Sequence, residues 1–559
     1  MKTFLKIFLV LAFISMIPRS AVAWVDDKDV MLVVKTSEKP VIDGQLDDVW
    51  KMTGKDRLLQ YDLTAGQAPA DWLDLYGTVR VLWDETNLYT FVEMYDETLS
   101  KDPDNTDNYQ FDSVELYFDA DNKKTAGAFD GVDDFQVVFS LGQTTLDDVD
   151  VGYGNGIPSW GFSKTGVEYA TFETTLGWNL ETQIPLSNLK IAPAKDAVFG
   201  FDVQIDDNDG GTTRQSLLRW WATNDAEWKD ASLFGTAKLH NDYVVSGYAL
   251  PVGKASFTPV IDGEFDADWA LVPEISENVF SVGDASLKSD WNDGTVDFKL
   301  MWDDTKLYIY ARVWDDLIQN TGDYQADGIE WYFDGDNAKT VANYDGLDDM
   351  QLRIKHVAAT TDEINPGGIV APSMFVRENV EFANLETDFG WTQEIAIPLA
   401  DLDISAEVAT EFGFDVQLNE SDEANVRETA SKWWSNSDNS WKDASLFGTA
   451  VLSGTSVGGT GIAERGGSAV RPRMLSLSQN YPNPFNPFTR IDYSVPARGK
   501  VRLEVFDLQG RLISTLVDGV KTPGLYTADL DGSSLRSGIY VCRLEMGSKI
   551  QTRKMTLIK

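Results

Sequence analysis

The ten residues Trp228–Ala237 read WKDASLFGTA, and the same ten letters return at Trp441–Ala450. Two further segments match in the same order along the two halves of the chain: VIDG at 41–44 and 260–263, and SVELYFD at 113–119 with GIEWYFD at 328–334. The spacing between the halves is far longer than the period of a solenoid or a propeller blade. We therefore predict two copies of one domain, at residues 24–243 and 244–453, and we expect each copy to be an independent domain with its own core.

Within each copy, apolar residues alternate with polar residues over short runs. Residues 78–82 and 88–92 are two such runs, and the polar segment DETN separates them. This pattern is typical of a β-hairpin. Further strands are expected at 113–118, 134–140, 168–174, 178–184 and 199–205. Because amphipathic helices are hard to find, we predict an all-β chain in which each copy is an antiparallel, jelly-roll-like β-sandwich.

The first 23 residues have the pattern of a signal peptide. Lys2 and Lys6 precede and flank the apolar run 7–17, and Ala21-Val22-Ala23 supplies the small-x-small cleavage pattern. No later stretch reaches 18 uninterrupted apolar residues. We expect an exported protein without a transmembrane segment after cleavage.

A different module follows the second copy. Residues 454–473 are rich in Gly, Ser and Thr and are expected to be a linker. Residues 474–559 hold 12 Lys and Arg against 7 Asp and Glu and contain no tryptophan. Their alternating segments predict a small Ig-like β-sandwich.

Three strings in this module, NYPNPFNP at 480–487, FDLQGR at 506–511 and SGIYVCRL at 537–544, resemble the C-terminal sorting domain of type IX secretion cargo. The resemblance implies passage through the type IX machinery of a Gram-negative-type bacterium. The implied destination is the medium or the outer-membrane surface.

The overall composition excludes several classes of function. Lys and Arg number 47 against 89 Asp and Glu, a formal net charge of −42, which would repel nucleic acid. With Cys542 as the single cysteine, no intrachain disulfide or cysteine-ligated metal site can form. The two histidines, His240 and His356, have no matched histidine in the other copy, so a duplicated haem site is unsupported.

Fourteen of the 18 tryptophans fall into seven matched pairs, most of which we expect in the core. Trp228 differs, because Asn224, Asp225 and Glu227 surround it. An aromatic ring among carboxylates and amides suits a sugar, whose CH face stacks on the ring while its hydroxyls form hydrogen bonds. A packed strand entry is the alternative, because an apolar pair follows the loop.

The motifs VIDGxxDxxW, WDxTxLY, GWxxExxIPL and WKDASLFGTA together resemble family 9 carbohydrate-binding modules over both copies. The family implies a terminal sugar clamped between two aromatic rings, with carboxylates and amides at its hydroxyls. Tyrosine stands at the early clamp position, where the family has tryptophan. The implied carbohydrate-binding residues are Tyr109, Glu115, Gln136, Asn224 and Trp228 in the first copy, and Tyr324, Glu330, Gln351 and Trp441 in the second.

The family also implies structural calcium, and acidic turns in both copies offer oxygen ligands. The candidate ligands are Asp119, Asp121, Asp130 and Asp133 in the first copy, and Asp334, Asp336, Asp345 and Asp348 in the second. An EF-hand is excluded, because Lys123 takes the fifth ligand position. Solvated turn carboxylates are the alternative, and no organic cofactor is expected.

These observations predict a secreted or cell-surface protein, not an enzyme, that binds a polysaccharide or glycan through two similar modules. The 89 acidic residues offer many possible carboxylate pairs of the kind that a glycoside hydrolase uses. However, the two copies leave no segment for a catalytic domain. The alternatives are a surface-structural or adhesion protein that uses the same sandwiches without sugar, and an accessory subunit of a polysaccharide-degrading system.

Overall fold

A computed structural model describes most of the chain as strands joined by turns and short 3-10 helices. It describes residues 30–58, 69, 74–101, 108–127, 129–146, 149–151, 162–245, 247–256, 258–265, 269, 272–283, 293–322, 324–358, 360–361, 375–387, 390–422 and 426–457, and, in the last module, 476–477, 488–495, 499–507, 511–521, 524–531, 535–536, 538–546 and 549–557. The chain divides into two compact units, residues 1–460 and 461–559. The predicted signal peptide lies outside the described residues.

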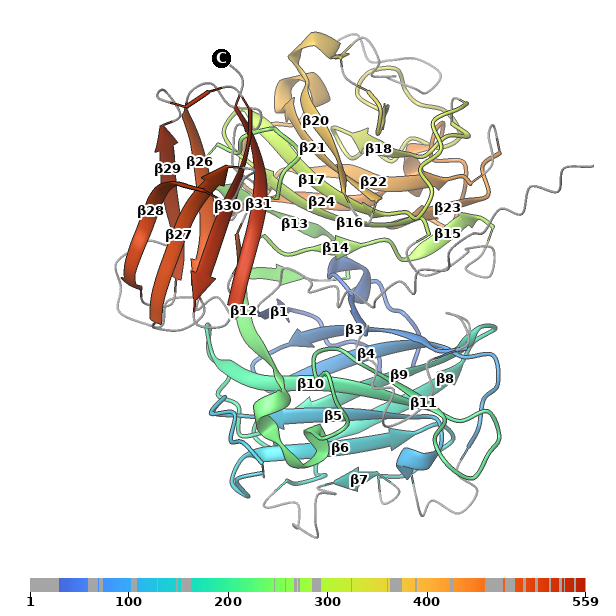
Figure 1. Cartoon of the computed structure of the whole chain (residues 1–559). Helices are drawn as coiled ribbons and strands as arrows, with labels where there is room; N and C mark the ends of the chain where they lie inside the picture. Colours follow the sequence, from blue (N-terminus) through green and yellow to red (C-terminus); the bar gives the residue numbers. More distant parts are fainter. Residues whose placement is uncertain are drawn as a thin grey trace, which may run out of the picture. The chain divides into compact units, whose positions relative to one another are not determined.

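The first copy is one twelve-stranded sheet (Figure 1). Its strands are β1 (Met31–Thr36), β2 (Asp56–Leu58), β3 (Tyr76–Trp83), β4 (Asn87–Tyr95), β5 (Ser113–Asp119), β6 (Asp134–Ser140), β7 (Asp150–Val151), β8 (Glu168–Glu173), β9 (Gly177–Pro185), β10 (Val198–Asp207), β11 (Ser216–Arg219) and β12 (Gly235–Val245). The main path runs β7-β6-β5-β10-β12-β1-β3-β4-β9-β8. All the expected strands are present, and β3 and β4 form the predicted hairpin, with Tyr76 opposite Tyr95.

The sheet curls so that its two halves enclose one core. Val79 of β3 and Leu180 of β9 pack in the same buried cluster as Val114 of β5 and Phe135 of β6. The all-β sandwich is therefore confirmed. One feature departs from a purely antiparallel arrangement, because β1 runs parallel to both of its neighbours, β12 and β3.

The second copy repeats this architecture with β13 (Leu250–Ala255), β14 (Ile275–Ser276), β15 (Val279–Val282), β16 (Thr295–Trp302), β17 (Lys306–Trp314), β18 (Gly328–Asp334), β19 (Met350–Lys355), β20 (Glu381–Thr387), β21 (Gly390–Pro398), β22 (Glu411–Glu420), β23 (Thr429–Lys432) and β24 (Gly448–Val457). Strand β13 again runs parallel to its neighbours, β24 and β16. Strand β24 extends to Val457, four residues into the predicted linker. Residues 458–473 of that linker lie outside the described residues.

The glycine of the GWxxExxIPL motif has a backbone role in both copies. Gly177 has φ +150° and Gly390 has φ +135°. A Cβ atom at either position would collide with a backbone carbonyl of the neighbouring strand, that of Met94 or Val313. Only glycine fits this start of β9 and β21.

The two copies share buried contacts. Arg57 Nη1 lies 2.8 Å from Asp297 Oδ2, and both side chains are nearly inaccessible to solvent. Trp433 Nε1 donates to the carbonyl of Lys51 at 2.7 Å. Trp50 of the first copy and Phe298 of the second belong to one continuous apolar cluster. We expected each copy to be an independent domain, but the structure joins part of the first copy to the core of the second.

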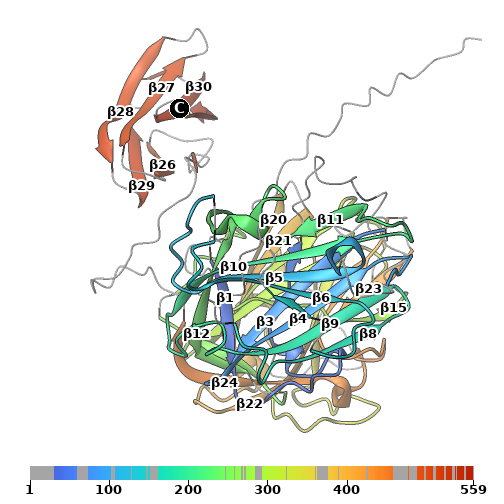
Figure 2. The same ribbon diagram turned by 90° about the horizontal axis from the view of Figure 1, so that it is seen from below.

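The C-terminal unit consists of two small sheets, drawn in red in Figures 1 and 2. Its strands are β25 (Ser476–Leu477), β26 (Phe488–Val495), β27 (Gly499–Asp507), β28 (Leu512–Lys521), β29 (Gly524–Asp531), β30 (Gly538–Met546) and β31 (Lys549–Leu557). The orders are β25-β26-β29 and β28-β27-β30-β31. Ile491 and Leu503 contribute to the buried core between them. Burial raises the pKa of the Cys542 thiol to about 12.

The described part of the chain contains no helix with the length and apolar character needed to cross a membrane.

Candidate functional site

A polar network covers the outer face of β5 and β6 in the first copy. Alternation along β5 sends Val114 and Leu116 into the core, so Glu115 and Tyr117 lie on the opposite face. The Glu115 carboxylate accepts hydrogen bonds from the Tyr117 hydroxyl and from Gln136 Nε2. The structure thus brings two of the predicted sugar-binding residues, Glu115 and Gln136, into direct contact.

Arg214 extends this network toward the surface. Its Nη1 donates to Asp206 at 2.7 Å, and its Nη2 donates to Asp225 at 2.8 Å. Asp225 also accepts from Arg219 at 2.7 Å. Burial raises the pKa of Asp206 well above its usual range, an effect that the nearby Glu115 carboxylate adds to and Arg214 opposes. A guanidinium held by two carboxylates is a rigid donor for sugar hydroxyls.

The two predicted clamp residues lie on segments that meet at Arg214. Tyr109, in the 3-10 helix η2 (Asn108–Gln110), is 39% exposed. The backbone amide of Arg214 donates to Gln110 Oε1 at 3.1 Å. Trp228, in η3 (Glu227–Lys229), donates from Nε1 to the carbonyl of Asp225 at 3.2 Å. Trp228 is half-buried against an aromatic cluster, so it has structural contacts as well as an accessible edge.

The second copy repeats the network. Glu330 of β18 accepts from the Tyr332 hydroxyl at 2.5 Å and from Gln351 Nε2 at 2.6 Å. The Arg427 guanidinium lies over the ring of Tyr324, 5.4 Å from its centroid. Tyr324 is 47% exposed and Trp441 is 42% exposed. The second copy therefore presents two solvent-accessible rings with an arginine against one of them.

Arg427 also donates to Asp438 at 2.5 Å, as Arg214 does to Asp225 in the first copy. Sequence reasoning missed both arginines. Their signal was available, because the two arginines stand 213 residues apart, the same spacing as the two copies of WKDASLFGTA. Asn224 is exposed, and its counterpart in the second copy is Ser437. The structure gives Asn224 no place in the network.

The predicted acidic turn of the first copy brings three carboxylates together. Oxygens of Asp119, Asp121 and Asp133 lie within 4.8 Å of one another. Lys123 forms an ion pair with Asp121. Asp130 instead accepts the backbone amide of Val132 at 2.7 Å, so it serves the turn itself.

The corresponding turns of the second copy are also held by backbone contacts. Asp334 accepts the amide of Lys339 at 2.9 Å, and Asp345 accepts the amide of Leu347 at 2.6 Å. The amide of Asp336 donates to Asp348 Oδ2 at 2.6 Å. These contacts give the predicted ligands a role in turn structure.

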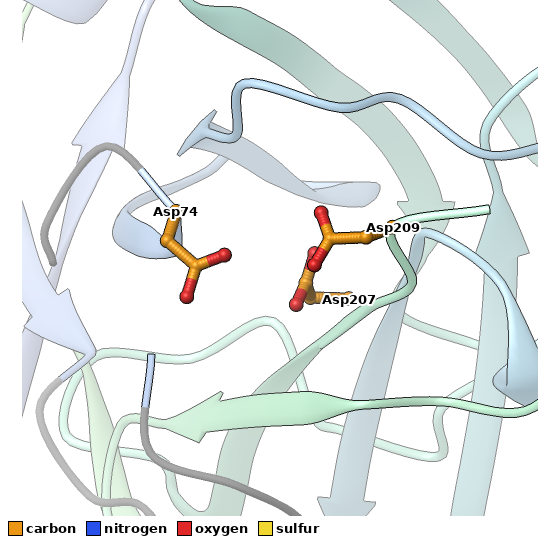
Figure 3. A group of neighbouring side chains, drawn as sticks. All are labelled: Asp74, Asp207 and Asp209. Atoms are coloured by element: carbon orange, nitrogen blue, oxygen red, sulfur yellow. The ribbon is translucent and has the colours of Figure 1, made fainter. Parts of the chain in front are cut away.

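A second acidic cluster, which we did not predict, lies at the ends of β3 and β10. Figure 3 shows Asp74, Asp207 and Asp209 turned toward one another, and their oxygens lie within 4.8 Å. Asp96 and Asp112 adjoin this group through Asp207. Burial raises the pKa of Asp207 to about 8, and burial together with the charge of Asp96 raises that of Asp112 to about 9. The second copy has a like group, Asp293, Asp316 and Asp422. Asp293 and Asp422 match Asp74 and Asp209, whereas Asp316 matches Glu97 and Glu420 stands at the position of Asp207.

Comparison with protein families agrees with this geometry. The model described as carbohydrate family 9 binding domain-like matches residues 42–242 and again residues 261–455. The chain belongs to this family. The family 9 copies are followed by a match to the secretion system C-terminal sorting domain at residues 479–559. The protein is therefore a secreted or cell-surface member of the family, built from carbohydrate-binding domains.

Curated relatives contain this tandem as part of larger proteins. Endo-1,4-beta-xylanase A of Thermoanaerobacterium saccharolyticum is 28% identical over 418 residues, which cover 74% of this chain and 30% of the relative. Exoglucanase XynX of Acetivibrio thermocellus is 28% identical over 419 residues, covering 74% of this chain and 32% of the relative. The chain thus spans about a third of the length of these family 9 relatives.

Among solved structures, a family 9 module of Caldicellulosiruptor kristjanssonii in complex with cellotriose is 21% identical, with a TM-score of 0.31. The match covers 41% of this chain and 98% of that module.

Proposed function

We propose that this protein is a non-catalytic, secreted polysaccharide-binding protein, in which each copy receives a sugar between its tyrosine and tryptophan. The observation that carries the proposal is the repeated set of a buried glutamate, its tyrosine and glutamine donors, and an arginine beside the ring-bearing segments. In the first copy this set is Glu115, Tyr117, Gln136 and Arg214. Rings supply stacking surface, and fixed planar polar groups supply orientation.

We further propose that the ligand is a β-1,4-linked xylan or glucan. The support is that both tandem-containing relatives are named for enzymes that act on such polymers. The chain carries the segment that those enzymes share and has a sorting module after it. An accessory role beside separate degrading enzymes follows from this arrangement.

The binding test is retention of the full chain on insoluble xylan and cellulose, followed by titration with soluble oligosaccharides. The wild-type protein is compared with a double variant, Arg214→Ala with Arg427→Ala, which removes both site arginines and leaves all four clamp rings in place. We expect the wild-type protein to be retained and the double variant to be weakened at least tenfold. Release of reducing sugar from any bound polymer would contradict the non-enzyme proposal, and absence of binding to all glycans would favour a surface-structural role.

We propose calcium as a structural ion at the cluster of Asp74, Asp207 and Asp209. Calcium prefers carboxylate oxygens. Asp207 is 1% exposed, and its Oδ1 has no hydrogen-bond partner among the described residues. The other carboxylate oxygen accepts from the Ser216 hydroxyl, so one buried oxygen is left without a donor. Such an oxygen is costly, and a bound cation would neutralise it. The predicted turn cluster at Asp119 is the weaker candidate, because Lys123 already neutralises Asp121.

We propose that the C-terminal unit directs the protein through the type IX machinery to the surface of a Gram-negative-type bacterium. The match to the sorting-domain family supports this route. Deleting residues 474–559 should leave the two copies folded in the periplasm. Detection of the truncated protein outside the outer membrane, by fractionation and immunoblotting, would contradict the assignment.

A further inference from the structure

The proposed sugar sites of the two copies differ in charge. Four substitutions between matched positions around Glu115 and Glu330 make the second site more positive than the first. The pairs, first copy and then second, are Val138 and Arg353, Ser140 and Lys355, Asp206 and Asn419, and Glu227 and Ser440. Each replacement removes an acid or adds a base. Asp202 and Asp415 behind the site are the same in both copies. These four changes together make the second site more positive than the first by four formal charges.

The two added bases lie on the same strand face as Gln351. On β19, alternation places Gln351, Arg353 and Lys355 on one side. Arg353 pairs across the ladder with Glu330, and its Nη1 lies 3.6 Å from Glu330 Oε1. Lys355 Nζ donates to the carbonyl of Gly322, two residues before the clamp residue Tyr324. One base thus lies at the glutamate and the other beside the segment that carries the ring.

The arginine at the centre of each site also has different partners. In the first copy Arg214 is held between two carboxylates, Asp206 and Asp225. In the second copy one of the two is an amide, because Arg427 Nη1 donates to Asn419 Oδ1 at 3.2 Å. An amide carries no net charge, so more of the positive potential of Arg427 remains for a ligand.

The Asn419 amide also changes the surroundings of the site glutamate. Asn419 Nδ2 donates to Glu330 Oε1 at 3.0 Å, whereas Asp206 sets a second carboxyl group beside Glu115.

Matched changes toward negative charge also occur. The change from Asn108 to Asp323 lies next to the clamp tyrosine, where the change from Asp107 to Gly322 offsets it. The changes from Gly210 to Glu423 and from Gln215 to Glu428 adjoin the acidic cluster in sequence, and Glu428 accepts the amide of Asp422. The net positive shift therefore lies on the strand face that carries Glu330 and Gln351.

We propose that the second copy binds a saccharide that carries a carboxylate, such as a uronic acid unit, while the first copy binds a neutral sugar. The inference rests on the proposed carbohydrate-binding function and names the ligand class of each site. The residues that determine the difference are Arg353, Lys355 and Asn419. A carboxylate on the ligand would meet these bases and the guanidinium of Arg427.

The test uses the full chain, because the copies share buried contacts. Trp228→Ala weakens the first site and Trp441→Ala weakens the second, so that each variant reports mainly the other site. The probes are methyl glucoside and methyl glucuronoside, which differ only in the group at C6, and affinity is measured by calorimetry. In the Trp228→Ala protein we expect glucuronoside to bind at least tenfold more tightly than glucoside. In the Trp441→Ala protein we expect the reverse order.

Replacing bases with the residues of the first copy supplies the second arm. Arg353→Val and Lys355→Ser should each lower the ratio of glucuronoside to glucoside affinity at least fivefold in the Trp228→Ala background. Because Lys355 is partly exposed, its replacement tests the inference even if Arg353→Val does not fold. Equal preference at both sites would overturn this inference alone. Failure of both glycosides and of xylan and cellulose to bind wild-type protein would overturn the proposed function as well.

Discussion

Replacing Trp441 with alanine should weaken sugar binding while leaving most of the folding free energy intact. Trp441 is 42% exposed. Taking about 250 Å² for the full surface of a large aromatic side chain, about 100 Å² is available to a ligand. A sugar covering one face would bury about half of this. At about 25 cal/mol per Å², the lost contact is worth about 1.3 kcal/mol, or roughly a tenfold loss of affinity.

Trp391 is the matched control, because it is fully buried in the core of the same copy. Its replacement by alanine should cost about 3–5 kcal/mol of unfolding free energy, the usual range for a buried tryptophan. Trp441 belongs to none of the apolar clusters formed by described residues, so its replacement should cost clearly less. The contrast between the two variants separates a ligand-facing ring from a packed one.

The assay combines urea denaturation with calorimetric titration of the full chain by a xylo-oligosaccharide that bears a glucuronate. Wild-type protein should show two sites, and the Trp441→Ala variant should retain the first site at unchanged affinity. If this variant loses as much unfolding free energy as Trp391→Ala and keeps both sites, then the ring is structural and the clamp assignment is wrong.

Three other perturbations have defined outcomes. Arg57→Ala leaves Asp297 buried without its cation, so urea denaturation should show a loss of about 3–5 kcal/mol, and a loss under 1 kcal/mol would show that the junction contributes little. Burial raises the pKa of Glu181 to about 7 in the folded protein. The contribution of Glu181 to folding stability is therefore complete below about pH 4.5 and is lost as the pH rises through about 7. Thermal melts should show the melting temperature falling over this pH range, and Glu181→Gln should remove most of that fall. Removing calcium with EDTA at pH 7.5 should lower the melting temperature. The decrease should be smaller at pH 5, where protons compete with calcium for the carboxylates. Asp207→Asn should abolish the effect of EDTA, and an EDTA response that persists in this variant would place the ion elsewhere.

The sequence predicted the strands because period-two alternation and burial coincide in this fold. The segment at 113–118 is an example, since every second residue enters the core and Glu115 is left on the outer face. The family resemblance also named Glu115 and Gln136 as site residues, but it did not predict their contact, which follows from the pairing of β5 with β6 that sets Tyr117 opposite Gln136. The parallel placement of β1 had no such signal, since the pairing of the first and last strands of a domain is not encoded in local pattern.

Other features depended on distances that only the folded chain defines. Asp74 and Asp207 are separated by more than a hundred residues, and topology alone brings them together. The degree to which Trp228 is buried also follows from tertiary packing, because Phe129 comes to it from a distant turn. Arg214 could have been found in the sequence, because an arginine stands at the matched position of the other copy. Its role could not, because that role depends on Gln110 and Asp225 lying on either side of it.

The shared buried contacts between the copies have a practical consequence for anyone who recombines this protein. Trp50 and Phe298 lie in one apolar cluster, and the indole of Trp433 is hydrogen-bonded to the backbone of the other copy. A cut between the copies would expose these groups to water, so a single copy taken as an affinity tag would be prone to aggregate. The two copies should therefore be kept together when this binding segment is moved into another protein, and fusion partners should be attached at the outer ends of the pair.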